Sequence, residues 1–272
     1  MKNQSYLIKC ITNMHVGNGD VNFGVIDNEV QRDPVTGFPC IYSSSVKGAL
    51  RDYFDENAYG QIEEIFGSDA KKSNDNRGEG SKKGLIKFMQ ADILFLPVRA
   101  IAGNQAYYMA TCKQALEDFG RHCNMIKGKT TNGKYDDLVK EIDSEKRYAQ
   151  ANDQKMRIGA FSDNSVKNPE LADIICEKFG IEKEKLVIVP DKEYSKITIP
   201  VLARNNLAVQ NLFYEEVVPH ESVFYFTVLS TGTNKADEAL DSFAGSMGNS
   251  SLVQLGGNAS IGYGLCEIKK LA

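Results

Sequence analysis

The chain has 272 residues, of which 42% are hydrophobic and 25% charged, a composition typical of a globular protein that buries a substantial core. No apolar run approaches the ~20 residues of a membrane span, and the N-terminal segment lacks the pattern of a secretory signal, so we expect a cytoplasmic protein with no membrane partner. Six cysteines without a CxxC pair argue against a disulfide framework or a zinc site. The net charge of −4 excludes a generally basic polyanion binder, although a single groove can still be basic.

The first third of the chain indicates a strand, a long loop and a helix. Alternating β-formers predict a strand over residues 5–12, and a loop at 13–39 follows with four glycines and two prolines. Serines that serve as N-cap candidates, followed by apolar residues at helical spacing, predict a helix over 43–56. Residues 67–84 are poor in apolar side chains and indicate a flexible insertion.

The remaining elements interleave without a regular βαβ repeat. In chain order we expect a strand at 84–98 ended by Pro97, helices at 112–120 and 169–180, strands at 185–190 and 196–202, an extended hairpin at 205–219, a strand at 221–230, a helix at 234–247 and a strand–turn–strand unit at 251–268. This order favours an α+β fold in one domain over 1–272.

The predicted helix at 43–56 has two interpretations. A helix N-terminus carries unpaired N–H groups and a partial positive charge, so the hydroxyls of Ser43, Ser44 and Ser45 with Lys47 beside them make a phosphate site, which Arg51 extends by one turn. The alternative is a capped surface helix whose two cations are solvated.

The segment LGGNASIGYGL at 255–265 also has two interpretations. Its glycines, Gly256, Gly257, Gly262 and Gly264, allow a backbone to approach a ligand closely, or they supply the positive φ angles of a tight hairpin. Neither GxGxxG nor Walker A spacing is present. His15, in the loop HVGNG, is a structural histidine unless its loop position gives it a functional role.

Among the acids of the long loop, Asp27 differs from the others. Asp33 precedes Pro34 and suits a turn. Asp27 follows Val25 and Ile26, so we expect burial of these apolar side chains to anchor the backbone while the carboxylate projects. Such an acid can orient a reacting group or hold a divalent cation, or it is one more turn residue.

Four motifs in this order resemble the RAMP proteins, the RNA-binding backbone subunits of CRISPR effector complexes. They are HVGNG with GVIDNEVQRDPVTGFP, the helix SSSVKGALR, the strand GLIKFMQADILFLPVRA and the glycine-rich LGGNASIGYGL. The segment NLFYEEVVPHESVFYF at 211–226 is more similar to the type III-B (Cmr) backbone subunit than to its type III-A (Csm) equivalent. The chain has IYSSSVKG where the family usually has Pro-Gly before two serines.

This resemblance implies a modified ferredoxin-like (RRM-like) core with an inserted lid and a β-hairpin thumb, expected at 190–215, and a catalytic loop at 13–42. It implies that copies of the chain stack along a CRISPR RNA together with other Cmr-complex subunits. Target RNA would be cut at regular intervals by a divalent-cation-dependent endoribonuclease, and the family's loop acid aligns with Asp27.

Under this interpretation Asp27 accepts a proton or binds Mg²⁺ or Mn²⁺, and His15 assists it. The expected RNA contacts are Arg32, Ser43, Ser44, Ser45, Lys47, Arg51, Gly256, Gly257, Gly262 and Gly264. Two alternatives remain: a non-catalytic RNA-binding scaffold of the type III-A kind, and a small-molecule hydrolase that uses the glycine-rich loops. The acid in GVID favours the endoribonuclease.

Overall fold

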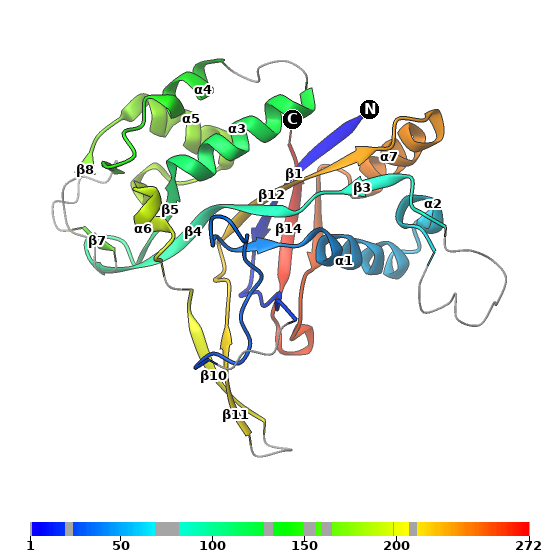
Figure 1. Ribbon diagram of the computed structural model, residues 1–272, viewed down its shortest axis with the longest axis horizontal. Helices are drawn as coiled ribbons and strands as arrows, with labels where there is room; N and C mark the ends of the chain where they lie inside the picture. The colour runs from blue at the N-terminus through cyan, green and yellow to red at the C-terminus, as the bar shows by residue number, and fades with distance from the viewer. Residues whose placement is uncertain are drawn as a thin grey trace.

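The computed structural model describes residues 2–19, 24–68, 82–127, 133–149, 156–158, 165–197, 199–206 and 211–271. Within these ranges a wide sheet has helices against both faces, and a two-stranded hairpin projects away from the body (Figure 1). The predicted α+β class is confirmed. The insertion predicted at 67–84 falls mostly outside the described residues.

The main sheet has twelve strands in the described ranges and is largely antiparallel; only the β5–β9 and β6–β8 pairs are parallel. Its main path runs β13-β14-β1-β12-β4-β5-β9-β6-β8. The bounds are β1 Asn3–Cys10, β2 Cys40–Ile41, β3 Ile86–Phe88, β4 Ala91–Ala102, β5 Tyr107–Cys112, β6 Arg147–Ala149, β7 Arg157–Ile158, β8 Ser165–Val166, β9 Leu186–Val189, β12 Val223–Ser230, β13 Ser250–Gln254 and β14 Leu265–Lys270. The chain thus begins and ends on neighbouring strands.

The helices divide between the two ends of this sheet (Figure 1). One group consists of α1 (Ser43–Glu56), α2 (Ile62–Phe66) and α7 (Asn234–Met247). The other consists of α3 (Lys113–Lys127), α4 (Gly133–Lys140), α5 (Pro169–Phe179) and α6 (Asp191–Tyr194). Two short 3₁₀ turns, η1 (Lys183–Lys185) and η2 (Ala259–Ile261), complete the described elements. No helix within the described ranges is long and apolar enough to cross a membrane.

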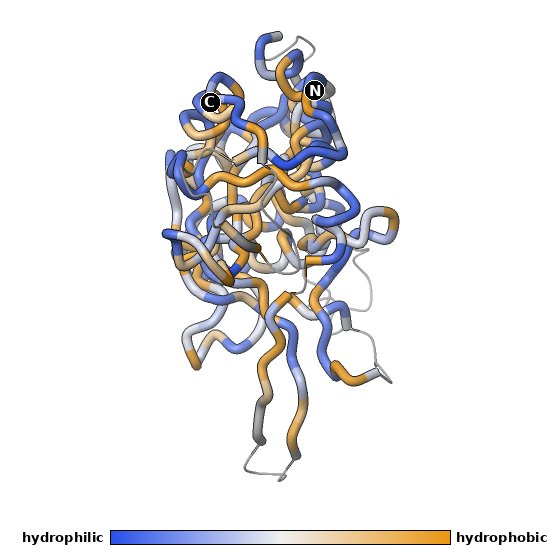
Figure 2. The backbone as a smooth tube through the Cα atoms, turned by 90° about the vertical axis from the view of Figure 1, so that its left-hand side faces the viewer, coloured by the Kyte–Doolittle hydropathy of each residue, from blue (hydrophilic) through white to orange (hydrophobic). Residues whose placement is uncertain are grey.

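The side chains of strand β12 show that both faces of the sheet are covered. Alternate side chains of a strand point to opposite faces. Phe224 and Phe226 enter a core shared with α1 and α7, whereas Tyr225 enters a second core shared with α3 and α5. The apolar sequence VFYFTVLS is therefore typical of a central strand that is buried on both sides. Figure 2 shows hydrophobic segments running through the middle of the body.

Three sequence predictions about these elements are wrong. Pro97 does not end its strand, because β4 continues to Ala102. The pairing of β4 with β12 reaches only the pair Phe95–Val223, so Pro97, which pairs with Met109 of β5, has no described partner strand on its other side, where a missing N–H is tolerated. The range 196–202 is mainly a connection after α6, and only its last two residues enter a strand. The serines do not cap α1: the N-cap residue is Tyr42, without a side-chain bond.

The projecting hairpin is formed by β10 (Val201–Asn206) and β11 (Asn211–Glu216). Figures 1 and 2 show it projecting from the body, and among the described strands β10 and β11 pair only with each other. Its described apolar side chains include Leu202, Leu212 and Tyr214, which are partly exposed to solvent. The base of the hairpin is held by the body, since Val218 exchanges two main-chain hydrogen bonds of 2.8 Å with Met14.

Candidate functional site

The segment that carries Asp27 lies along strand β11. The N–H groups of Asp27 and Asn28 both donate to the carbonyl of Tyr214 at 3.0 Å, and the N–H of Glu216 donates to the carbonyl of Asn28 at 2.9 Å. Asn28 and Glu215 form a parallel bridge. The loop is therefore attached to the hairpin as a short third strand, although the two are far apart in sequence.

The carboxylate of Asp27 is exposed and held from one side. Its Oδ2 accepts a 2.7 Å hydrogen bond from the main-chain N–H of Tyr214. We expected burial of Val25 to anchor this segment; that expectation is wrong, because Val25 is 83% exposed and the anchors are the main-chain hydrogen bonds to β11. Asp27 still has the predicted arrangement of a fixed backbone with a carboxylate that faces solvent.

Glu216, at the base of β11, binds the loop a second time. Its side chain is 7% exposed; Oε2 accepts the N–H of Val30 at 3.0 Å, and Oε1 lies 2.7 Å from the guanidinium of Arg32. Arg32 also donates to the carbonyl of Gly37 at 3.2 Å. The predicted RNA contact Arg32 is thus already engaged within the protein, and its charge compensates a buried carboxylate.

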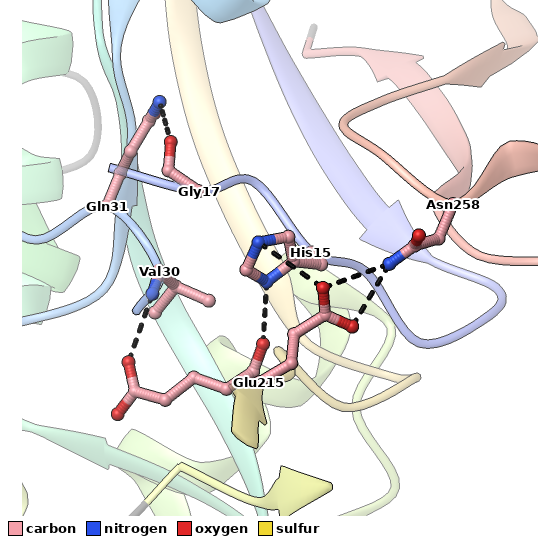
Figure 3. Close-up of polar contacts among 7 residues, drawn as sticks. His15, Gly17, Val30, Gln31, Glu215 and Asn258 are labelled. Carbon is pink, nitrogen blue, oxygen red and sulfur yellow. Dashed lines mark hydrogen bonds and ion pairs between the residues drawn. The ribbon is translucent and has the colours of Figure 1, made fainter. Parts of the chain in front are cut away.

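His15 connects the hairpin to the glycine-rich turn (Figure 3). Its Nδ1 is 2.7 Å from the carbonyl of Glu216, and because a carbonyl only accepts, this nitrogen carries the proton. Its Nε2 is 3.7 Å from Glu215 Oε1, and Asn258 Nδ2 donates to both oxygens of Glu215 at 3.1 and 3.0 Å. His15 is 9% exposed, so in this structure it braces the hairpin base.

The glycines at 256–264 serve close contacts between backbone segments. A Cβ added at Gly256 would lie 2.2 Å from the carbonyl oxygen of His15, and the N–H of Gly257 donates to that same oxygen at 2.9 Å. A Cβ at Gly264 would lie 2.0 Å from the carbonyl of Leu255. Gly256, Gly262 and Gly264 all have positive φ. Of the two interpretations, the tight turn is the one these contacts support, and the turn lies directly against His15.

Helix α1 begins beside the same loop. Gln31 Nε2 donates to Ser45 Oγ at 2.9 Å, and its Oε1 accepts the N–H of Tyr42 at 2.6 Å, so the loop fixes the start of the helix. Ser43 and Ser44 are exposed and Lys47 is half-buried. Arg51 instead donates to the carbonyl of Gly67 at 2.8 Å, which ties α1 to the end of α2.

A groove of about 640 Å³ separates α1 from the edge strand β13. Its wall near the start of α1 consists of small or polar residues, which include Gly17, Ser45, Gly48, Gln254 and Gly256. Asp52 and Glu56 lie further along the helix. Any polyanion in this groove therefore binds at the N-terminal end of α1, because the two carboxylates repel it from the other end.

Asp33 is a turn residue, as predicted. Its Oδ1 accepts the N–H groups of Val35 and Thr36 at 3.0 and 2.8 Å and the Thr36 hydroxyl at 3.0 Å. Burial alone would raise the pKa of Asp33, but these hydrogen bonds outweigh it, and the pKa lies below its usual value. Asp33 therefore shapes the turn between the Asp27 segment and β2.

The structure brings together residues that the sequence separated. Asp27, Arg32, His15 and the glycine-rich turn all meet around the base of the hairpin, whereas Arg51 does not join them. The sequence assigned no role to Glu215, Glu216 or Asn258, which the structure places in the site. Two adjacent acids in an apolar strand segment were the available signal, because buried carboxylates require partners.

These side chains do not form a closed metal site. Within the described ranges no group of three or more His, Cys, Asp or Glu side chains is arranged to hold an ion. Asp27 offers Oδ1, which accepts no hydrogen bond from the described residues. A single carboxylate oxygen fits a hydrated Mg²⁺ that shares its other ligands with a substrate phosphate, but not an ion held by the protein alone.

Fold and site define an α+β protein whose exposed acid is fixed against a projecting hairpin, the base of which His15 joins to a glycine-rich turn. The model of the RAMP superfamily matches residues 7–267 of the chain. The chain therefore belongs to the RAMP superfamily, and the resemblance seen in the motifs is confirmed.

Individual relatives agree with this membership. The chain is 28% identical over 285 residues to the CRISPR system Cmr endoribonuclease Cmr4 of Pyrococcus furiosus, covering 95% of this chain and 92% of the relative. A crystal structure of oligomeric Cmr4 from Pyrococcus furiosus superposes with a TM-score of 0.72 at 23% identity, covering 99% of this chain and 98% of the other. The type III-B Cmr-beta complex bound to cognate target RNA contains a chain with a TM-score of 0.75 at 21% identity, covering 100% and 98%.

Proposed function

We propose that the protein is a backbone subunit of a type III-B CRISPR effector complex in the cytoplasm, and that it cleaves guide-complementary target RNA with Asp27. The observation that carries this proposal is the exposed Asp27 carboxylate fixed against the hairpin. It is supported by the similarity to the Cmr endoribonuclease along nearly the whole chain. The partners would be CRISPR RNA, target RNA, further copies of the chain and the other subunits of the complex.

The hairpin β10–β11 suits the role of the thumb in the elaborated ferredoxin-like core that the family resemblance implies. The helices α3, α4 and α5, which build their own core, would be the inserted lid. A projecting hairpin with exposed Leu202, Leu212 and Tyr214 can separate stacked bases, because apolar wedges inserted at a base step unstack it. Asp27 lies at the side of this hairpin, where a displaced nucleotide would be presented.

The chemistry follows from a strand held in that position. The 2′-OH of the displaced nucleotide attacks the adjacent phosphorus, its oxygen forms the new bond, and the P–O5′ bond breaks to leave a 2′,3′-cyclic phosphate and a 5′-OH. Asp27 Oδ1 accepts the 2′-OH proton, and the departing O5′ takes a proton from solvent. Alignment of the 2′-oxygen with the phosphorus supplies much of the rate acceleration. This is expected where guide pairing selects the target sequence.

A weakly bound divalent cation, Mg²⁺ or Mn²⁺, is part of this proposal. Phosphate oxygens of the RNA would hold it, joined by Asp27 Oδ1 if that oxygen serves as a ligand instead of as the base, and the bound ion would neutralise charge at the reacting phosphate. The expected guide contacts are Ser43, Ser44, Lys47 and the N–H groups at the start of α1, together with Ser45, which lines the groove beside the glycine-rich turn. Arg51 and Arg32 would shape this surface through their contacts within the protein.

The test is cleavage by an assembled complex that carries Asp27→Ala. We expect guide-directed cutting to be abolished while complex assembly and target binding persist. The matched control is Glu29→Ala, which removes a carboxylate two residues away in the same loop and should leave cutting intact. Cutting at the wild-type rate by the assembled Asp27→Ala complex would favour the scaffold, in which another subunit cleaves.

A further inference from the structure

The direction of the Asp27 carboxylate is set by a main-chain group of the hairpin. In β11 the N–H and C=O groups of Tyr214 both point to the loop: the N–H donates to Asp27 Oδ2 at 2.7 Å and the carbonyl accepts from Asp27 and Asn28 at 3.0 Å. Asp27 and Tyr214 therefore form a closed ring of hydrogen bonds between one residue of the loop and one residue of the hairpin.

The register of the hairpin shows why Tyr214 is available for this contact. Tyr214 faces Ala203, and Val217 donates to the carbonyl of Pro200 at 2.8 Å. Antiparallel partners alternate between pairs that exchange hydrogen bonds and pairs that do not. Residues 213, 215 and 217 therefore bond to β10, whereas Leu212, Tyr214 and Glu216 direct their N–H groups outward.

The remaining loop contacts keep this arrangement in place without touching the acid itself. The Glu216 carboxylate accepts hydrogen bonds from the Val30 N–H and the Arg32 guanidinium, and the Glu216 N–H donates to the carbonyl of Asn28. Within the described ranges, no side chain donates a hydrogen bond to the Asp27 carboxylate. One oxygen is fixed by the hairpin backbone and the other faces solvent, so a displacement of β11 redirects the acid.

We propose that the main-chain N–H of Tyr214 is a positioning group for Asp27, so that the position of β11 relative to the Asp27 loop sets the rate of RNA cleavage. The inference rests on the proposed role of Asp27 as the cleaving acid. RNA that engages the exposed side chains of Leu212 and Tyr214 acts on the acid through this single bond. The hairpin is thereby both the element that displaces a nucleotide and the element that aims the carboxylate.

The discriminating substitution is Tyr214→Pro in the assembled complex. It removes the N–H that Asp27 accepts and leaves the β10–β11 hydrogen bonds intact, because residue 214 makes none of them. Ala203→Pro is the matched control, since Ala203 faces Tyr214 and also directs its N–H out of the β10–β11 pair, where no described group accepts it. Tyr214→Ala removes the same ring and keeps the N–H. Single-turnover cleavage and target affinity are measured for all three.

We expect Tyr214→Pro to cut saturating target roughly 10- to 100-fold more slowly than Tyr214→Ala, as a misdirected acid should, with the same target affinity as Tyr214→Ala. Ala203→Pro should cut at the wild-type rate. Equal rates for Tyr214→Pro and Tyr214→Ala would overturn the inference.

A second variant covers the case in which proline prevents assembly. An α-hydroxy analogue of tyrosine at position 214 replaces only the N–H by an ester oxygen, and the same exchange of the N–H at position 203 is its control. The expected slowing and the overturning result are the same as for proline. If Asp27→Ala abolishes cutting while both 214 variants match their controls, only the inference is lost; if Asp27→Ala cuts normally, the proposed function itself is lost.

Discussion

The guanidinium of Arg32 lies 2.7 Å from the carboxylate of Glu216, across the junction between the acid loop and the hairpin. Glu216 is nearly buried and also accepts the N–H of Val30, so the ion pair closes a contact that the loop cannot make alone. Removing one partner of such a pair leaves an uncompensated charge, which is more costly than the loss of an exposed pair.

We therefore predict a measurable coupling free energy between Arg32 and Glu216. In a double-mutant cycle of Arg32→Leu and Glu216→Gln, the glutamine keeps an acceptor for Val30 and removes only the charge. Urea unfolding should give a coupling of about 1–3 kcal/mol. The exposed pair Lys140–Asp137 is the matched control and should show no measurable coupling. Additive effects of Arg32→Leu and Glu216→Gln would contradict this account of the junction.

The close approach of the glycine-rich turn to His15 gives a second prediction. Gly256→Ala places a Cβ about where the His15 carbonyl oxygen lies, at a positive φ, and should destabilise the fold by roughly 2 kcal/mol or more. Gly245→Ala, at an exposed position of α7 with open space around it, should instead stabilise the protein by about 1 kcal/mol. Thermal unfolding of the two variants measures both effects, and equal melting temperatures would refute the contact.

His122 gives a prediction about pH. Burial lowers the pKa of His122 to about 4, and its Nε2 contacts the hydroxyl of Thr227. The unfolded chain protonates this ring below about 6.5, so the unfolded state binds more protons and stability falls as pH decreases from about 6.5 to 4. His122→Gln should flatten the decline in unfolding free energy over this window by about 2 kcal/mol. Parallel pH profiles for the two proteins would show that this ring does not contribute.

Lys47 gives a prediction about RNA affinity. It lies one turn into α1 and makes no hydrogen bond or ion pair within the described ranges, so its charge is available to a phosphate. Lys47→Ala should weaken guide RNA binding by a similar factor for every sequence and reduce the salt dependence of log Kd by about one unit. Lys235→Ala, at the start of α7, is the matched control. An unchanged salt dependence for Lys47→Ala would exclude this residue as an RNA contact.

Local patterns identified much of the fold. Helices α1 and α7 span the predicted ranges, α5 ends at Gly180 in a left-handed conformation as predicted, and Asp33 forms its turn. Each of these features depends on residues within a few positions of one another, which is the information that periodicity and capping contain. Cys176 is half-buried, and the other five cysteines are buried.

The site was less predictable, because its contacts join distant segments. Asp27 bonds to Tyr214, and Arg32 pairs with Glu216, across most of the chain. A cation in a sequence gives no sign of whether a buried carboxylate will meet it, which is why Arg32 and Arg51 were interpreted as open to RNA. The acid itself was identified from a family resemblance, and the apolar residues before it gave the wrong reason for its rigidity.

The most direct test of the central claim is the single-turnover rate of target cleavage by an assembled complex that carries Asp27→Asn. The asparagine carbonyl can still accept the Tyr214 N–H, so the geometry of the loop is preserved while the capacity to accept a proton or to ligate a cation is reduced. We predict a loss of at least about 100-fold in rate with unchanged target affinity. Cleavage by the Asp27→Asn complex at the wild-type rate would contradict the account.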